Sequence, residues 1–376
     1  MHVVQQILAP DAPFVAENLP ANAQLVLAFG ARSMLEQPGL YEALRARCPH
    51  ACIAGCSTAG EICATAVNDG TVVVTAVDFA QAHVLMAIET VSHPQDSRAV
   101  GQALTTELLG EDLRHILVLS DGLLVNGSEL VQGLRSALPE GVNVTGGLAG
   151  DGADFAQTAV MANGPATSGQ VVAIGFYGER LHVGYGSVGG WDAFGPERIV
   201  TRSEGNVLYG LDGESALQLY KTYLGPHAAD LPSSGLLFPM SMRLPGAQAP
   251  VVRTILAVNE QDQSMTFAGD IPQGATVQLM KANFNRLVDG AIDAAQVNQS
   301  QLQGRAAQWA VLISCIGRKL VLKQRIEEET EGVAAILGAQ AALSGFYSYG
   351  EIAPHGAFTP CELHNQTMTV TTFTEE

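Results

Sequence analysis

The 376-residue sequence is poor in basic residues. Lysine and arginine together number 19 against 37 aspartates and glutamates, so the formal net charge is −18 at pH 7. Basic residues form no run anywhere along the sequence. On average such a surface is repelled by nucleic-acid phosphates and by anionic bilayers, so we expect neither nucleic acid nor a membrane as a partner.

Signals for export and for membrane insertion are also lacking. Residues 1–20 include Asp11 and Glu17 and have no basic segment followed by an apolar core, which is unlike a signal peptide. No stretch approaches the ~18 uninterrupted apolar residues of a membrane-spanning helix. None of the six cysteines forms a CxxC pair, as zinc ribbons and redox motifs would require. We therefore expect a cytoplasmic protein with reduced thiols.

Several well-known catalytic and nucleotide-binding motifs are absent from the sequence. No GK[ST] completes a P-loop, and no GxGxxG opens a helix after a strand. The hydrolase and protease motifs GxSxG, SxxK and HExxH do not occur either. A CxxCH motif is missing, which excludes a covalently attached c-type haem.

What the sequence does contain is apolar material and glycine. Apolar residues make up 47% of the chain, and 40 residues are glycine, well above the usual ~7%. Apolar runs at 24–30, 115–119 and 309–314 are typical of buried strands, and the spacing of apolar residues from 283 onward predicts an amphipathic helix. Alternating strands and helices indicate an α/β fold, which we divide into domains at 1–204 and 205–376.

Two distant segments of the sequence resemble each other. Residues 55–62 read GCSTAGEI and residues 345–352 read GFYSYGEI, so both follow the pattern Gxx[ST]xGEI. Upstream, residues 27–32 resemble 313–318 in the same order, and a weaker third version lies at 146–151. This order predicts an internal duplication that gives two related mixed-sheet halves, with helices packed on the sheets.

The repeated turns have the chemistry of a binding loop. Their glycines permit positive φ angles or close backbone approach, and successive N–H groups can converge on an anion. Each turn also carries a hydroxyl donor and an acid, such as Thr58 with Glu61 and Ser348 with Glu351. The alternative is that the glycines only form tight turns and that Glu61 and Glu351 cap neighbouring backbone groups.

These motifs resemble the FIST family, whose members carry paired N-terminal and C-terminal FIST domains. The resemblance runs from about residue 24 to 372 and is carried by the residues at 55–62, 146–151, 201–209, 314–318, 345–352 and 363–367. It implies a non-catalytic sensory role in bacterial signal transduction with a small ligand. A stand-alone branch of the family looks like nitric-oxide sensors that bind haem and regulate a partner histidine kinase.

For haem, the resemblance implies a non-covalent haem b with an axial ligand in an apolar pocket, most often histidine. We take His364 first, because it lies in the family-like segment 363–367, and His355 second, because it follows the second octapeptide. The partner would be a histidine kinase or a cyclase regulated in trans. Self-association into a homo-oligomer is left open.

An amino-acid-like ligand without haem would use the same turns. Arg318 would hold the ligand's carboxylate in a bidentate grip, and Glu61, Asp151 or Glu351 would receive its ammonium group. Arg318 has an alternative role as an ion-pair partner of the acidic stretch 327–331 or of Glu351. The candidate ligand-binding residues are Gly55, Cys56, Ser57, Thr58, Glu61, Gly146, Gly147, Asp151, Arg318, Tyr347, Ser348, Glu351 and Asn365.

Two further classes of function remain as alternatives. An enzyme would use Cys56 or Ser57 in the glycine turn as nucleophile, with His364 brought close by folding as the base. A pure interaction module would present Phe346, Tyr347 and Tyr349 as an aromatic contact patch, although alternating aromatics on a strand are more often core.

Overall fold

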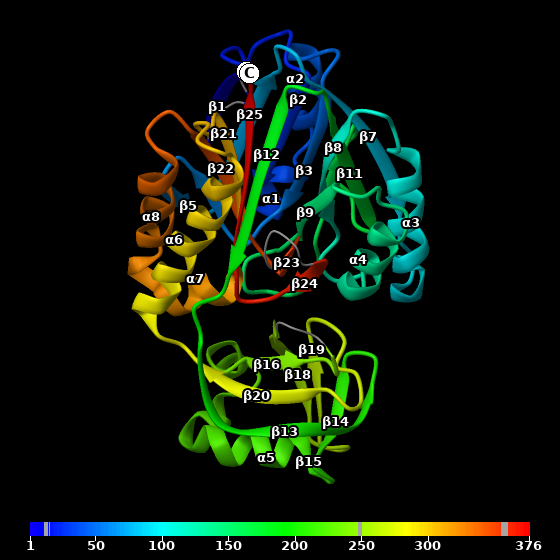
Figure 1. Ribbon diagram of the computed structural model, residues 1–376, viewed down its shortest axis with the longest axis vertical. Helices are drawn as coiled ribbons and strands as arrows, with labels where there is room; N and C mark the ends of the chain where they lie inside the picture. Colours follow the sequence, from blue (N-terminus) through cyan, green and yellow to red (C-terminus); the bar gives the residue numbers. More distant parts are fainter. Residues whose placement is uncertain (11–13, 15, 247–249, 355–359) are drawn as a thin grey trace.

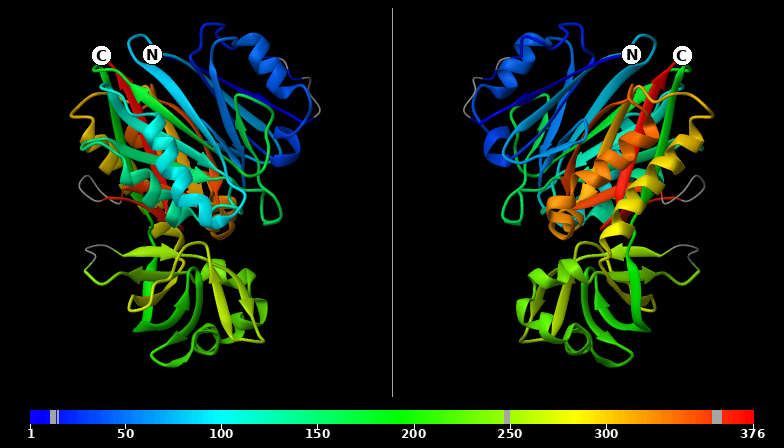
Figure 2. Two further views of the ribbon diagram at one scale, coloured as in Figure 1. Left: turned by 90° about the vertical axis from the view of Figure 1, so that its right-hand side faces the viewer. Right: turned by 90° about the vertical axis from the view of Figure 1, so that its left-hand side faces the viewer.

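A larger body built on three β-sheets and a smaller body built on a fourth make up the computed structural model, which describes all residues except 11–13, 15, 247–249 and 355–359. In Figures 1 and 2 the smaller body lies below the larger one, and Figure 2 shows both chain termini at the far end of the larger body. The helices of the larger body cover the outer faces of its sheets (Figure 1). The expected α/β fold with helices on mixed sheets is confirmed.

The described part of the larger body consists of three copies of one strand–helix–strand unit, here called repeats A, B and C. Repeat A comprises β2 (Leu25–Gly30), α1 (Arg32–Leu35), α2 (Leu40–Arg47), β3 (Cys52–Ser57), β4 (Glu61–Cys63), β5 (Ala66–Asn68), β6 (Val72–Asp78), β7 (His83–Thr90) and α3 (Ser97–Glu107). Repeat B comprises β8 (Leu113–Ser120), α4 (Gly127–Ser136), β9 (Asn143–Leu148), β10 (Val160–Ala162), β11 (Gln170–Tyr177), β12 (Leu181–Val188) and α6 (Phe284–Gln301). Repeat C comprises β21 (Trp309–Cys315), α7 (Ile316–Leu322), α8 (Glu327–Leu337), β22 (Ala342–Ser348), β23 (Gly350–Pro354), β24 (Cys361–His364), β25 (Met368–Glu375) and, from the other end of the chain, β1 (His2–Leu8).

The three sheets share one strand order. Each is centred on a parallel pair from a single repeat (β2–β3, β8–β9 or β21–β22), flanked by an antiparallel strand of that repeat (β6, β11 or β25). The strands next to these three come from other repeats: β1, β7 and β12 on one side, β10, β23 and β4 on the other. Two of the sheets carry one more strand at the edge, β24 beside β23 and β5 beside β4. The duplication expected from the sequence is therefore part of a threefold arrangement, in which 146–151 occupies the third place.

A glycine at one register position explains why the turns resemble each other. Gly55, Gly146 and Gly345 each lie opposite the matching residue of the neighbouring parallel strand, namely Ala28, Val118 and Leu312. An added Cβ at any of the three glycines would overlap the carbonyl oxygen of that facing residue. The strands can pack this closely only without a side chain here.

Just beyond these glycines the repeats are joined in a ring. The amide of Ala59 donates to the carbonyl of Tyr347 at 2.8 Å, and the equivalent amide of Tyr349 donates to Leu148 at 3.1 Å. The ring closes where Gly150 donates to the carbonyl of Ser57 at 2.9 Å. Each repeat thus hydrogen-bonds to the next around a pseudo-threefold axis.

The inner faces of the three sheets form a shared core. Alternate residues of each central strand point into it, and all of them are fully buried: Leu27 and Phe29, Leu117 and Leu119, Val311 and Ile313. Continuous apolar strands of this kind are expected where both faces of a sheet are covered.

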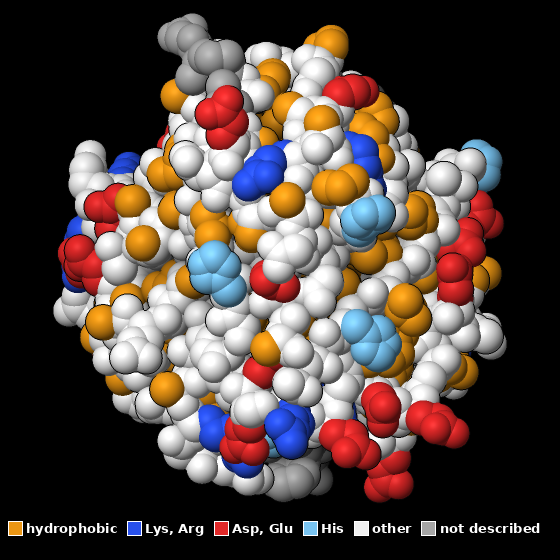
Figure 3. All heavy atoms as spheres, turned by 90° about the horizontal axis from the view of Figure 1, so that it is seen from above, with side chains coloured by type: hydrophobic (Ala, Val, Ile, Leu, Met, Phe, Trp, Pro, Cys, Tyr) orange, Lys and Arg blue, Asp and Glu red, His pale blue; other side chains and the backbone are white. Residues whose placement is uncertain are grey.

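A dipeptide at the opposite end of the larger body, called the barrel from here on, also occurs once in each repeat. His2, His83 and His182, each followed by valine, occupy equivalent positions at the starts of β1, β7 and β12. Figure 3 views this end of the molecule and shows its histidines separated from one another, with basic side chains scattered rather than gathered. The His-Val dipeptide is therefore a threefold signal in the sequence, one that the comparison of the glycine turns does not include.

The smaller body is inserted between β12 and α6 of repeat B. It comprises β13 (Asp192–Glu204), β14 (Val207–Leu211), β15 (Glu214–Ser215), α5 (Ala216–Leu224), β16 (Met240–Arg243), β17 (Val251–Arg253), β18 (Ile255–Asn259), β19 (Ser264–Phe267) and β20 (Thr276–Lys281). It has its own apolar core, which includes Tyr220 and Phe267. The predicted boundary at 204/205 falls in the turn between β13 and β14, inside this body. Among the described helices, none is long and apolar enough to cross a membrane.

We predict that Gly55→Ala destabilises the protein by more than about 2 kcal/mol, because the new methyl group must displace the facing backbone. Gly146→Ala and Gly345→Ala should do the same. Chemical denaturation measures the effect. Gly164→Ala, where the nearest atom to the added Cβ is 3.8 Å away, is the matched control and should stay within about 0.5 kcal/mol of the parent. Equal effects at Gly55 and Gly164 would contradict the close-packing role.

Candidate functional site

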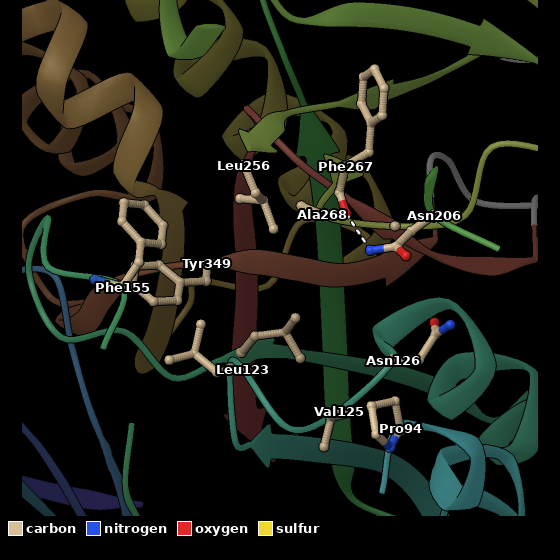
Figure 4. Close-up of a pocket in the computed structure, with 13 residues that line it drawn as sticks. Pro94, Leu123, Val125, Asn126, Phe155, Asn206, Leu256, Phe267, Ala268 and Tyr349 are labelled. Carbon is tan, nitrogen blue, oxygen red and sulfur yellow. Dashed lines mark hydrogen bonds between the residues drawn. The ribbon is translucent and has the colours of Figure 1, made fainter. Parts of the chain in front are cut away.

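A cavity of about 180 Å³ lies between the lower end of the barrel and the smaller body. Figure 4 shows its lining residues converging from both bodies. The barrel contributes Pro94, Gly122, Leu123, Val125, Asn126, Leu148, Phe155 and Tyr349, and the smaller body contributes Asn206, Leu256, Phe267, Ala268 and Gly269. Concave, largely apolar sites between two domains are where small-molecule ligands usually bind.

The barrel side of the cavity lies at the carboxyl ends of the parallel strands β8 and β9. There the chain leaves the sheet in two loops, one leading into α4 and the other running from 149 to 157. Crevices at the carboxyl ends of parallel strands are the usual ligand sites of α/β sheets. In repeat B the first of these loops begins with Gly122, whose amide donates to the hydroxyl of Thr158 at 2.9 Å.

Asp121 fixes the first loop. Its buried carboxylate accepts from the amides of Leu123 and Leu124 at 2.8 Å and of Gly169 at 2.9 Å. An aspartate bonded to the amides two and three residues ahead is a common turn arrangement. Asp121 therefore holds Leu123 at the cavity wall while its own charge is taken up by backbone groups.

Asp151 fixes the second loop in the same way. Its carboxylate accepts from the amides of Phe155, Ala156 and Gln157 at 2.8–2.9 Å and from the hydroxyl of Tyr349. Desolvation raises the pKa of Asp151, but these four hydrogen bonds outweigh it, so the pKa is lowered overall. The carboxylate stays ionised, and both of its oxygens already accept hydrogen bonds from protein groups.

Phe155 and Tyr349 form an aromatic wall. Their rings stack with centroids 4.4 Å apart and an interplanar angle of 15°. Tyr349 also accepts from the amide of Phe155 at 3.3 Å. Because Asp151 holds both the tyrosine hydroxyl and the loop that carries Phe155, the wall is fixed before any ligand arrives.

Polar contacts beside the cavity join the smaller body to the barrel. The side-chain amide of Asn126, which also caps α4, donates to Asp270 at 3.0 Å. Arg253, which is buried, donates to the carbonyl of Leu363 at 2.8 Å.

The side chain of Asn365 donates to the carbonyl of Tyr349 at 3.2 Å and accepts from the amide of Thr254 at 3.4 Å. Asn365, one of the predicted site residues, therefore links the aromatic wall to the smaller body.

Glu61 and Glu351 occupy equivalent, buried positions away from the cavity. Glu61 accepts from the hydroxyl of Thr58 at 2.6 Å and from the hydroxyl of Thr71 at 2.9 Å. Glu351 accepts from Ser348 at 2.7 Å and from Thr367 at 2.9 Å. Both carboxylates also accept the amide of the same threonine, so they cap neighbouring backbone as the alternative interpretation proposed.

Burial raises the pKa of both glutamates. Desolvation is the largest cause in each case, and for Glu351 it raises the pKa to about 7 despite the hydrogen bonds from Ser348 and Thr367. Neither group lines the cavity.

The other residues of the glycine turns are packed in the ring or the core. Cys56 is fully buried, and burial raises the pKa of its thiol well above the ordinary value, which is the reverse of what a nucleophile needs. The hydroxyl of Ser57 accepts from the amide of Ala159 at 2.9 Å. Gly147 lies against Ile313 and Phe346, so it belongs to the core as well.

Arg318 is the ion-pair partner of the acidic stretch. It donates to Glu329 at 2.8 and 3.1 Å and to the carbonyls of Leu287 and Gly189, and it is fully buried. Tyr347 donates to the same Glu329 at 2.7 Å. The structure therefore brings Arg318 and Tyr347 together through Glu329, with the guanidinium engaged by protein groups rather than facing the cavity.

The described residues do not fit a haem in this cavity. His364 is buried in β24, with its Nε2 3.0 Å from the carbonyl oxygen of Ala353, and His355 lies outside the described residues. The described cavity lining includes no histidine or cysteine, and its volume is below the ~300–1,000 Å³ of drug-sized ligand pockets. Among the residues that the structure describes, no cluster of three His, Cys, Asp or Glu side chains is placed to hold a metal ion.

Most cavity residues escaped the sequence interpretation. Of the predicted ligand and haem residues that the structure describes, Asp151 and Asn365 support the cavity wall and none lines it directly. Tyr349, named in the sequence only as part of an aromatic contact patch, does line it. The lining comes from separate segments between residues 94 and 349, which no local pattern connects. One local signal existed: the sequence Ser120-Asp-Gly122 directly after a buried strand indicates a turn at a strand end.

These features define a two-body protein with a cavity between the bodies. The chain belongs to the FIST family: the FIST N domain matches residues 24–214 and the FIST C domain matches residues 216–354. FIST domains are associated with sensory signal transduction and small-ligand binding, and they are generally non-catalytic.

Other comparisons add little. A search of curated proteins finds no significant match. A crystal structure of cyanuric acid hydrolase from A. caulinodans is similar over 100% of this chain and 99% of its own, at 9% identity and a TM-score of 0.36. A likeness at this level carries no conclusion about activity.

We predict that Glu351 makes stability fall as pH rises. Its folded-state pKa of about 7 exceeds the ordinary 4.5, so its contribution is complete below pH 4.5 and is lost on rising through pH 7, by an amount on the order of 3 kcal/mol. Denaturation at pH 5 and pH 8 should show a smaller pH-dependent loss in Glu351→Gln than in the parent. The exposed Glu111→Gln is the control, and a slope unchanged by Glu351→Gln would refute the assignment.

Proposed function

We propose that this protein is a non-catalytic sensor that binds a small ligand in the cavity between the barrel and the smaller body. The observation that carries the proposal is the cavity's place: its two walls belong to different bodies. A ligand that touches both walls favours the arrangement in which the bodies are docked.

The connections between the bodies suit such a readout. The chain passes between them at 189–191 and again at 282–283, and Arg318 binds the carbonyls of Gly189 and Leu287 beside these two passages. The barrel therefore fixes both ends of the insert, while the cavity contacts hold its near face. A bound ligand would change the contacts at that near face and so change the surface that the protein presents to a partner.

Haem binding, nitric-oxide sensing, regulation of a histidine kinase or cyclase and a cytoplasmic location remain predictions that rest on the family resemblance and on sequence composition. A haem would need a site other than this cavity. The buried, high-pKa thiol of Cys56 gives the enzyme alternative no support.

Thermal-shift screening of small molecules tests the proposed site, with Ala268→Trp filling the cavity. A ligand at ~100 times its Kd should add about 2.7 kcal/mol to the unfolding free energy of the parent and nothing to that of Ala268→Trp. The exposed Ala99→Trp on α3 should keep the response. Small-angle scattering should show the ligand making the parent more compact. Ligands whose stabilising effect persists in Ala268→Trp would place the site elsewhere.

The haem prediction has its own measurement. Protein expressed with haem supply is examined by absorbance, before and after nitric oxide is added. If haem binds as the family resemblance implies, the protein shows a stoichiometric Soret band that nitric oxide shifts, and His364→Ala abolishes it. Because the cavity's size and lining do not fit a haem, the band should be unchanged in Ala268→Trp. Absence of a stoichiometric band in the parent would refute the haem prediction.

A further inference from the structure

We propose that the cavity is specific for a small, uncharged molecule with one flat apolar ring. This inference rests on the proposed function, since it names the ligand class of the same site. It is carried by the lining's charge, its hydrogen bonding, its aromatic wall and its size.

Charge is the first of these observations. The protein has a net charge of −18, yet none of the described residues that line the cavity is charged. The charged groups beside the cavity already have protein partners. Asp121 and Asp151 are each bonded to three backbone amides, and Asp270 accepts from the side chain of Asn126. The buried Arg253 donates to the backbone carbonyls of Asp270, Val252 and Leu363. An ionised ligand group would therefore be desolvated without a partner, which is strongly unfavourable.

The polar side chains of the lining are mostly engaged already. The side-chain oxygen of Asn126 accepts from the amides of Ser128 and Glu129 at 3.0 and 3.1 Å, while its nitrogen donates to Asp270. The nitrogen of Asn206 donates to the carbonyl of Phe267 at 2.8 Å, as the dashed line in Figure 4 shows. The side chain of Asn126 and the side-chain nitrogen of Asn206 are therefore already engaged, and a ligand would have to break these bonds to use them.

The aromatic wall favours a flat ligand. Phe155 and Tyr349 both line the cavity and are stacked on each other, with Leu123, Leu148 and Leu256 among the apolar residues around them. A planar apolar ring can pack against this wall by offset stacking or edge-to-face contact, each worth ~0.5–1.5 kcal/mol beyond area burial.

Size limits the ligand to about one ring. An apolar cavity of ~150 Å³ in another protein is large enough for benzene, and this cavity measures about 180 Å³. A free amino acid is comparable in size but zwitterionic, so the same arguments disfavour the amino-acid-like ligand expected from the sequence.

Phenol, benzoate and benzylamine test the class, because they share a ring and differ in charge at pH 7. Ligand-observed NMR titration of the parent should show phenol binding at least tenfold more tightly than either ion. Phe155→Leu should weaken phenol binding about three- to tenfold through lost ring packing. Phe284→Leu, at an exposed phenylalanine of α6, should leave it unchanged.

The outcomes distinguish the proposed ligand class from the proposed ligand site. Benzoate or benzylamine binding as tightly as phenol, or phenol binding that Phe155→Leu does not weaken, would overturn the ligand class. The ligand class would also be overturned if none of the three probes bound while Ala268→Trp still abolished the stabilisation by other compounds. That result would leave the proposed site intact. Phenol binding that survives in Ala268→Trp would overturn both proposals.

Discussion

The close approach of parallel strands at Gly55, Gly146 and Gly345 is the constraint on which the larger body depends. A side chain at any of these positions would collide with the facing carbonyl, so only glycine allows the three strand pairs to reach the axis. There the amides of Ala59, Gly150 and Tyr349 can bond to the next repeat. The ring satisfies backbone groups that would otherwise be buried without partners, and it aligns the carboxyl ends of all three pairs at one end of the barrel.

Equivalent ends do not make equivalent sites. In repeat C the corresponding place is filled by Lys319, whose ammonium donates to the carbonyl of Ala59 at 2.8 Å and lies 5.5 Å from the ring centre of Tyr347. In repeat B the same place has Leu148 and Tyr349, and the smaller body covers it. Divergence of side chains on a shared backbone thus leaves this crevice open to a ligand.

The cavity also shows how an acidic protein keeps a site neutral. Asp121 and Asp151 stand directly behind its walls, but backbone amides and one tyrosine hydroxyl take up their charge. The same bonds fix the loops that carry Leu123 and Phe155. Carboxylates therefore act here by positioning apolar side chains, which fits the uncharged ligand proposed for this site.

The sequence by itself determined the α/β class, the family and the octapeptide turns, because these depend on local periodicity and on glycines within a few residues of each other. It also showed the hydroxyl–acid pairs, such as Ser348 with Glu351, three residues apart. Only the tertiary structure decided the threefold arrangement, since repeat C takes β1 from the other end of the chain and Gly146 lacks the neighbouring Ser/Thr and Glu. The cavity likewise depends on side chains from two bodies, and no spacing of residues along the chain predicts that these side chains lie together.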